Sequence, residues 1–67
     1  MASPDGTAIR SKRLERGLGL QEFARKCGVD AGNLSRIENG KAGARMATLR
    51  QIAAALDVAI TEIAVFP

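Results

Sequence analysis

Histidine, tryptophan and tyrosine are absent from this 67-residue sequence, and cysteine occurs once, at Cys27. One cysteine without histidine cannot form a Cys/His zinc site or an intrachain disulfide, so Cys27 is expected to be a small core residue. No apolar run approaches the ~20 residues of a membrane span, and no secretion signal is recognisable. We therefore expect a cytoplasmic protein without a metal, other cofactor or membrane partner. The lack of catalytic residue sets argues against an enzyme.

Aromatic residues are almost as scarce, since only Phe23 and Phe66 are present. The core must therefore be built from aliphatic side chains and alanine. Residues 1–67 are enough for one small domain, which buries only about 60% of the surface that its unfolded chain exposes. Pairing with a second copy is a natural way to add stability to such a domain.

Positive charge is concentrated in the first part of the chain. Residues 1–50 carry all ten lysines and arginines and five acidic residues, a net charge of +5, whereas residues 51–67 carry only Asp57 and Glu62. A basic body with a slightly acidic, apolar tail suits a polyanion on one side and a protein contact on the other.

Apolar residues recur at three- and four-residue spacing, which predicts an all-α fold of five short helices. The expected helices cover residues 4–16, 20–27, 31–39, 46–56 and about 61–65. Ser3, Pro4 and Asp5 suit the start of the first helix, Gly17 should end it, and Leu14 should be half buried. The last segment is rich in β-branched residues, so an extended ending is also open.

The second and third expected helices are joined by a three-residue turn, Gly28-Val29-Asp30. Glycine readily takes the left-handed conformation that ends a helix, and aspartate is a good N-cap for the next helix. Small Ala24 allows the two helices to cross closely. This is the plan of a helix-turn-helix, in which the second helix enters the major groove of DNA.

A specific order and spacing of residues runs through two segments, IRSKRLERGLGLQEFARKCGVDAGNLSRIENGK and TLRQIAAALDV. Over about residues 7–63 the chain resembles the Cro/CI-type (XRE) helix-turn-helix family of phage-repressor-like DNA-binding regulators. The resemblance implies a compact five-helix domain of the lambda-repressor type. It also implies that residues 31–39 form the recognition helix and that residues 20–27 bridge the DNA backbone.

The positions of the recognition helix that meet bases are Ala31, Gly32, Asn33 and Arg36. Alanine suits the methyl group of thymine, asparagine can pair with adenine, and arginine can form two hydrogen bonds with guanine. Gly32 offers no side chain but permits close approach of the backbone to DNA. Relatives often have longer polar residues at the first two positions, so we expect this recognition helix to distinguish few bases.

The resemblance also implies an ion pair between Arg13 and Glu38, which would join the first and third helices and direct the arginine toward phosphate. Relatives often begin the second helix with Ser or Thr and then a Gln that holds phosphate. Here Gly19 and Leu20 stand at those positions, and Gln21 is the candidate substitute. The predicted contacts with the DNA backbone come from Arg13, Gln21, Ser35, Asn39, Lys41 and Arg45.

These features predict a transcriptional regulator, most simply a repressor, that binds a palindromic site on double-stranded DNA as a homodimer. The predicted dimer contact is the apolar tail, with Val58, Ile60, Ile63, Val65 and Phe66. Folding of this tail onto its own core is the alternative. Alternative functions are an antitoxin that holds a small protein partner, or an interaction module that no longer recognises DNA. A restriction-modification controller protein would be a variant of the main hypothesis.

Overall fold

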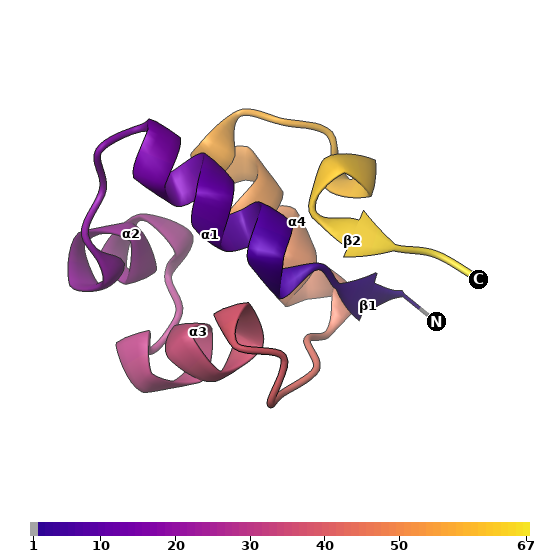
Figure 1. The fold of residues 1–67 in the computed structure, drawn as a ribbon. Helices are drawn as coiled ribbons and strands as arrows, with labels where there is room; N and C mark the ends of the chain where they lie inside the picture. Colours follow the sequence, from indigo (N-terminus) through magenta and orange to yellow (C-terminus); the bar gives the residue numbers. More distant parts are fainter. Residues whose placement is uncertain (1) are drawn as a thin grey trace.

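The computed structural model describes residues 2–67, which form four α-helices, one turn of 3-10 helix and a two-stranded sheet (Figure 1). The elements in chain order are β1 (Ser3–Pro4), α1 (Gly6–Glu15), α2 (Leu20–Cys27), α3 (Ala31–Glu38), α4 (Met46–Leu56), η1 (Ile60–Glu62) and β2 (Ala64–Val65). The all-α class is confirmed, but the expected fifth α-helix is absent from the described residues. Figure 1 shows both chain ends on one side of the molecule, next to the small sheet.

The core is aliphatic around a single aromatic residue, Phe23. Its fully buried large side chains are Phe23, Ile9, Leu34, Ile37, Leu49, Ile52, Leu56 and Ile63. Leu14 was expected to be half buried but is 53% exposed. On a helix it points about 100° away from its buried neighbour Arg13, which places it beyond the edge of the core-facing side.

The first helix begins two residues later than predicted. Asp5 is its N-cap, and a side-chain oxygen of Asp5 accepts a hydrogen bond from the amide of Ala8 at 3.1 Å. Ser3 and Pro4 form β1 instead, because the end of the chain offers them an antiparallel partner and the fixed φ of proline also suits an extended edge strand. Gly17 lies just past the end of the helix, as predicted, with a positive φ of 68°.

The predicted helix at residues 61–65 is wrong, and the extended alternative describes the end of the chain better. One 3-10 turn over Ile60–Glu62 is followed by β2, in which Ala64 pairs with Pro4 and Val65 with Ser3. The amide of Asp5 donates to the carbonyl of Ile63 at 2.9 Å and extends this pairing. The sheet therefore forms because the two ends of the chain meet, which no local pattern contains.

Gly6 allows α1 to start directly against the C-terminal end of α3. The residue is buried, and a Cβ atom at this position would clash with the carbonyl oxygens of Ile37 and Glu38. Any larger residue would push the two helices apart, at a typical cost of about 1–3 kcal/mol. The importance of Gly6 comes from a neighbour far along the chain, so no local sequence pattern indicates it.

Candidate nucleic-acid interface

The turn between α2 and α3 has the predicted geometry. Gly28 adopts the left-handed conformation with φ 72°, and the amide of Val29 donates to the carbonyl of Ala24 at 3.0 Å. Asp30 caps α3, since its side chain accepts a hydrogen bond from the amide of Asn33 at 3.0 Å. These local interactions fix the angle between the two helices and set the exposed face of α3.

The exposed face of α3 contains the residues predicted to contact bases. Gly32 and Arg36 are exposed and lie one turn apart, so they share a face of the helix. Asn33 and Ala31 are each half buried, and Ala31 packs partly against the core while the rest of its surface stays exposed. Because Gly32 has no side chain, the guanidinium of Arg36 is the largest polar group on this face.

The predicted ion pair between Arg13 and Glu38 is present and buried, and each residue is only 7% exposed. Nε of Arg13 donates to Oε2 of Glu38 at 2.8 Å, and Nη2 donates to Oε1 at 3.0 Å. The remaining Nη1 donates to the carbonyl of Leu18 at 2.9 Å. Hydrogen bonding to Glu38 raises the pKa of Arg13 above its usual value.

The predicted contact between Arg13 and phosphate stays a prediction, and only 7% of this residue is exposed. Its guanidinium lies inside the protein, and all three of its nitrogens donate to Glu38 or Leu18. The pair holds together α1, the C-terminal end of α3 and the segment that leads into α2. Through the position of α3 it also influences the candidate nucleic-acid surface.

Backbone amides just beyond α3 are already used within the chain. The amides of Asn39, Gly40 and Lys41 donate to the carbonyls of Ser35, Ile37 and Arg36 respectively. The side chain of Asn39 also donates to the carbonyl of Ser35 at 2.9 Å. The exposed side chain of Lys41 is therefore the main group here that is free to meet a phosphate.

The helices differ in whether a side chain accepts a hydrogen bond from the backbone amides of their first turn. Asp5 and Asp30 cap α1 and α3 through their side chains, whereas Gly19 and Arg45, which precede α2 and α4, make no side-chain cap. The first-turn amides of a helix carry partial positive charge, so an open N-terminus attracts anions. Sequence reasoning missed this property at α4, although the absence of an acceptor side chain at residue 45 signals it.

Two predicted backbone contacts lie beside these open N-termini. Gln21 is exposed in the first turn of α2, and Arg45 is exposed immediately before α4. The structure thus combines an exposed face of α3 with two helix ends and with basic side chains. Groups of these kinds are the ones that contact bases and phosphates in nucleic-acid complexes.

The predicted dimer residues fall into three groups. Val58 and Ile60 are half buried against the core, whereas Val65 and Phe66 are 61% and 42% exposed. Ile63 is fully buried in its own chain, so the prediction that it contacts a second copy is wrong. Its side chain faces inward because β2 draws the tail onto the helices.

Other kinds of site have no support in residues 2–67. Residues 2–67 contain no group of His, Cys, Asp and Glu placed to hold a metal ion, and no helix long and apolar enough to cross a membrane. Burial is the main cause that raises the pKa of the Cys27 thiol to about 11, with the carboxylate of Glu38 adding to the effect.

The packed α2 and α3, the turn at Gly28 and the exposed face of α3 define a helix-turn-helix domain. A family model described as helix-turn-helix (HTH_3) matches residues 9–63, and the chain belongs to this family. The resemblance to the Cro/CI-type (XRE) family is thereby confirmed. The family and the curated relatives are transcriptional regulators, which are not enzymes.

Curated and solved relatives agree with this assignment. The chain is 43% identical over 54 residues to the HTH-type transcriptional repressor RghR of Bacillus subtilis, a match that covers 79% of this chain and 40% of RghR. It thus spans about two-fifths of the length of the curated relatives it matches. The restriction-modification controller protein C.AhdI from Aeromonas hydrophila superposes with a TM-score of 0.82 at 26% identity, covering 85% and 86% of the two chains. The biofilm regulator SinR in complex with DNA gives 0.78 at 37% identity, covering 84% and 90%.

Proposed function

We propose that this chain binds double-stranded DNA in a sequence-specific manner and regulates transcription, most simply as a repressor that blocks RNA polymerase. The helix-turn-helix with its exposed face of α3, in a chain whose helices α2 and α4 have open N-termini, is the observation that carries the proposal. The relatives support it, since SinR is solved in complex with DNA and RghR is named a repressor.

Base recognition is assigned to four residues of α3. Arg36 would form two hydrogen bonds with a guanine, Asn33 would pair with an adenine, and Ala31 would contact a thymine methyl group. Each good polar pair discriminates against a wrong base by about 1–3 kcal/mol. Gly32 would let the backbone of α3 approach the base edges closely.

Phosphate binding is assigned to the groups that surround α3. The side chains of Lys41, Arg45 and Gln21 would act together with the first-turn amides of α2 and α4. Ser35 and Asn39 remain candidates for phosphate contact. The side-chain amide of Asn39 already donates to the carbonyl and hydroxyl oxygens of Ser35, so only the donors that these bonds leave unused would reach a phosphate. These contacts would orient α3 in the DNA groove but would not distinguish one base from another.

We further propose that two copies bind one palindromic site, with their recognition helices about 34 Å apart in successive major grooves. Two polar base contacts per chain give limited discrimination, and a second copy doubles them. The dimer contact is assigned to the apolar tail through Val65 and Phe66, with Val58 and Ile60 beside them. Ile63 supports this surface from within the core.

The first test is fluorescence anisotropy with a duplex from the upstream region of its own gene and a random duplex, across a salt series. We expect steep salt dependence and a preference for the upstream duplex. Arg36→Ala should reduce that preference about tenfold or more, since it removes one base contact. Arg16→Ala is the matched control, because Arg16 is an exposed arginine at the C-terminal end of α1 and is not among the residues assigned to DNA.

Each outcome has a distinct meaning. Loss of preference in Arg36→Ala alone supports direct recognition of a base by that residue. Equal losses in both variants would show that Arg36 contributes only charge. Absence of binding by the unchanged protein at low salt would reject the proposed function.

A protein partner is the second candidate role. A solved complex of SinR with SinI matches this chain with a TM-score of 0.80 at 35% identity, covering 84% of this chain and 55% of the matched one. An antitoxin or another regulator held by a small protein fits this likeness. Copurification of one small protein in a fixed ratio with the chain, expressed in its source cells, would support this role.

A further inference from the structure

A polar groove of about 370 Å³, the α1–α3 groove, lies between α1 and the C-terminal end of α3. Its wall on α1 contains Thr7, Arg10 and Ser11, and its wall at the end of α3 contains Asn39 and Gly40. The walls lie close together because α1 begins directly against the last carbonyl groups of α3. The proposed function assigns no role to these three residues of α1.

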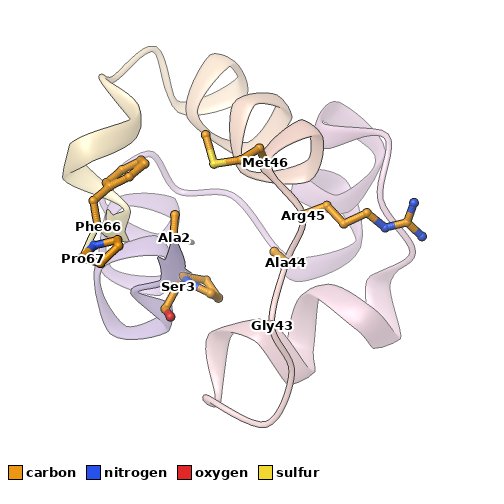
Figure 2. Close-up of a pocket in the computed structure, with 9 residues that line it drawn as sticks. Ala2, Ser3, Gly43, Ala44, Arg45, Met46, Phe66 and Pro67 are labelled. Carbon is orange, nitrogen blue, oxygen red and sulfur yellow. The ribbon is translucent and has the colours of Figure 1, made fainter.

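The α1–α3 groove differs in chemistry from an apolar groove of about 860 Å³ that the two chain ends form with the loop between α3 and α4 (Figure 2). Arg45 is the only charged residue that lines the apolar groove, and Figure 2 shows its guanidinium pointing away from Met46 and Phe66. The α1–α3 groove instead contains an arginine and two hydroxyl groups in one wall. These groups suit an anion, because they can donate charge-assisted hydrogen bonds to it.

The polar side chains of α1 in this groove are not used within the protein. Thr7, Arg10 and Ser11 are exposed, and among residues 2–67 no ion pair or side-chain hydrogen bond involves them. Their three- and four-residue spacing places them on one face of α1. A guanidinium with two hydroxyl groups on one face can donate to the oxygens of a single phosphate.

The acidic residue in the lining of the α1–α3 groove is already neutralised. Glu38 lines the groove, and its two carboxylate oxygens accept hydrogen bonds from Arg13 at 2.8 Å and 3.0 Å. Because this buried pair carries no net charge, Arg10 gives the groove a positive charge. An anion that enters the groove would therefore be attracted.

The α1–α3 groove continues the exposed face of α3. Gly32, Arg36 and Asn39 follow one another at four- and three-residue spacing, so Asn39 lies at the end of the face assigned to bases and also lines the groove. The eight residues of α3 span about 12 Å, similar to the width of the DNA major groove. With its first residues at the base edges, α3 would bring its C-terminal end to the sugar-phosphate backbone beside the major groove.

We propose that the α1–α3 groove binds a phosphate of the DNA backbone beside the C-terminal end of α3. The guanidinium of Arg10 would donate to two phosphate oxygens, and the hydroxyl groups of Thr7 and Ser11 would donate from the same face of α1. Leu14 also lines the groove and is 53% exposed, so it would pack against the carbon atoms of the adjoining deoxyribose. The inference rests on the DNA binding of the proposed function and adds α1 to its contacts.

The test is fluorescence anisotropy of Arg10→Gln with the upstream and random duplexes, across a salt series. A phosphate contact carries no sequence information, so binding to both duplexes should weaken by the same factor, about fivefold. The slope of log affinity against log salt should become shallower by about 0.9, the value for one phosphate. Arg16→Gln is the matched control, since it removes the same charge from an exposed arginine at the end of α1, outside the groove.

Duplexes that carry one neutral methylphosphonate group each identify the phosphate that is bound. One position should weaken binding of the unchanged chain about as much as Arg10→Gln does, and should have no further effect on Arg10→Gln. Ser11→Asp should weaken binding more than Ser11→Ala, because it places a negative charge against the phosphate. Circular dichroism checks that each variant keeps its helices.

Three results would overturn the inference while DNA binding itself stands. These are equal effects of Arg10→Gln and Arg16→Gln, methylphosphonate effects that are the same in Arg10→Gln and the unchanged chain at every position, and a loss of preference for the upstream duplex in Arg10→Gln. The last result would show that Arg10 contacts a base instead. Absence of binding by the unchanged chain at low salt would reject the proposed function, and the phosphate site with it.

Discussion

Cys27 ends α2 inside the aliphatic core, where only 3% of its surface reaches solvent. Removal from water disfavours the thiolate, and this burial together with the nearby Glu38 carboxylate raises the pKa of the thiol to about 11. The thiolate is the form that reacts with oxidants and metals. Cys27 is therefore an apolar core residue at neutral pH, in agreement with its prediction from sequence.

The raised pKa of Cys27 predicts that stability decreases at high pH. The unfolded thiol loses its proton near pH 9 and the folded one near pH 11, so the stabilisation is complete below pH 9 and is lost as pH rises toward 11. We expect the free energy of unfolding to fall by about 2 kcal/mol over this interval. Urea titrations at several pH values, with Cys27→Ala as the control, measure it. Parallel curves for the two proteins would contradict the assignment.

At the scale of elements, the four helices divide into two kinds by their N-termini. The capped helices α1 and α3 have an aspartate whose oxygen satisfies a first-turn amide, whereas α2 and α4 begin after Gly19 and Arg45 without a side-chain cap. An uncapped end costs a little stability and leaves amide donors for an external anion. This division matches the proposed contacts of α2 and α4 with phosphate.

Capping α2 is expected to change stability and DNA affinity in opposite directions. Gly19 has φ −72° and ψ 162°, and an added Cβ would meet nothing within 4 Å, so larger residues fit there. Gly19→Asn should raise stability by a few tenths of a kcal/mol. It should also weaken DNA binding about fivefold, because its side chain would occupy an amide assigned to phosphate.

Two further substitutions at Gly19 separate the causes. Gly19→Asp caps the helix and adds a negative charge, so it should weaken binding more than asparagine does. Gly19→Ala adds a Cβ without an acceptor and should leave affinity close to that of the unchanged chain. Thermal unfolding and anisotropy give the two readouts. Equal affinity in all three variants would show that the N-terminus of α2 does not hold phosphate.

At the scale of the whole molecule, the buried pair of Arg13 and Glu38 connects parts that are far apart in sequence. It joins α1 to the end of α3, and its third hydrogen bond reaches Leu18 before α2. Removal of one partner would leave the other charge buried without a counterion, which typically costs about 3–5 kcal/mol. That is a large share of the stability of a small domain.

A double-mutant cycle tests this role of the pair. Arg13→Met and Glu38→Met should each lower the free energy of unfolding by about 3 kcal/mol or more. The double variant should recover most of the loss, because no unpaired charge remains in the core. Urea unfolding measures all four proteins. If the two single losses simply add, the pair is not a coupled structural unit.

Local chemistry in the sequence alone determined α2, α3, α4, the turn at Gly28 and the cap at Asp30. Hydrophobic periodicity and capping act within a few residues, so they are visible without a structure. The family resemblance supplied the pairing of Arg13 with Glu38. The spacing of the apolar residues of α3 predicted which side of this helix faces the core and therefore which side is exposed.

The tertiary structure alone decided how the ends of the chain fold. The pairing of β1 with β2, the burial of Ile63 and the close contact at Gly6 all join segments distant in sequence. Whether Arg13 faces phosphate or the interior depends on the same packing, since an ion pair does not fix its own burial. Non-local contacts have no signature in a short window of sequence, and the groove at the chain ends exists only through them.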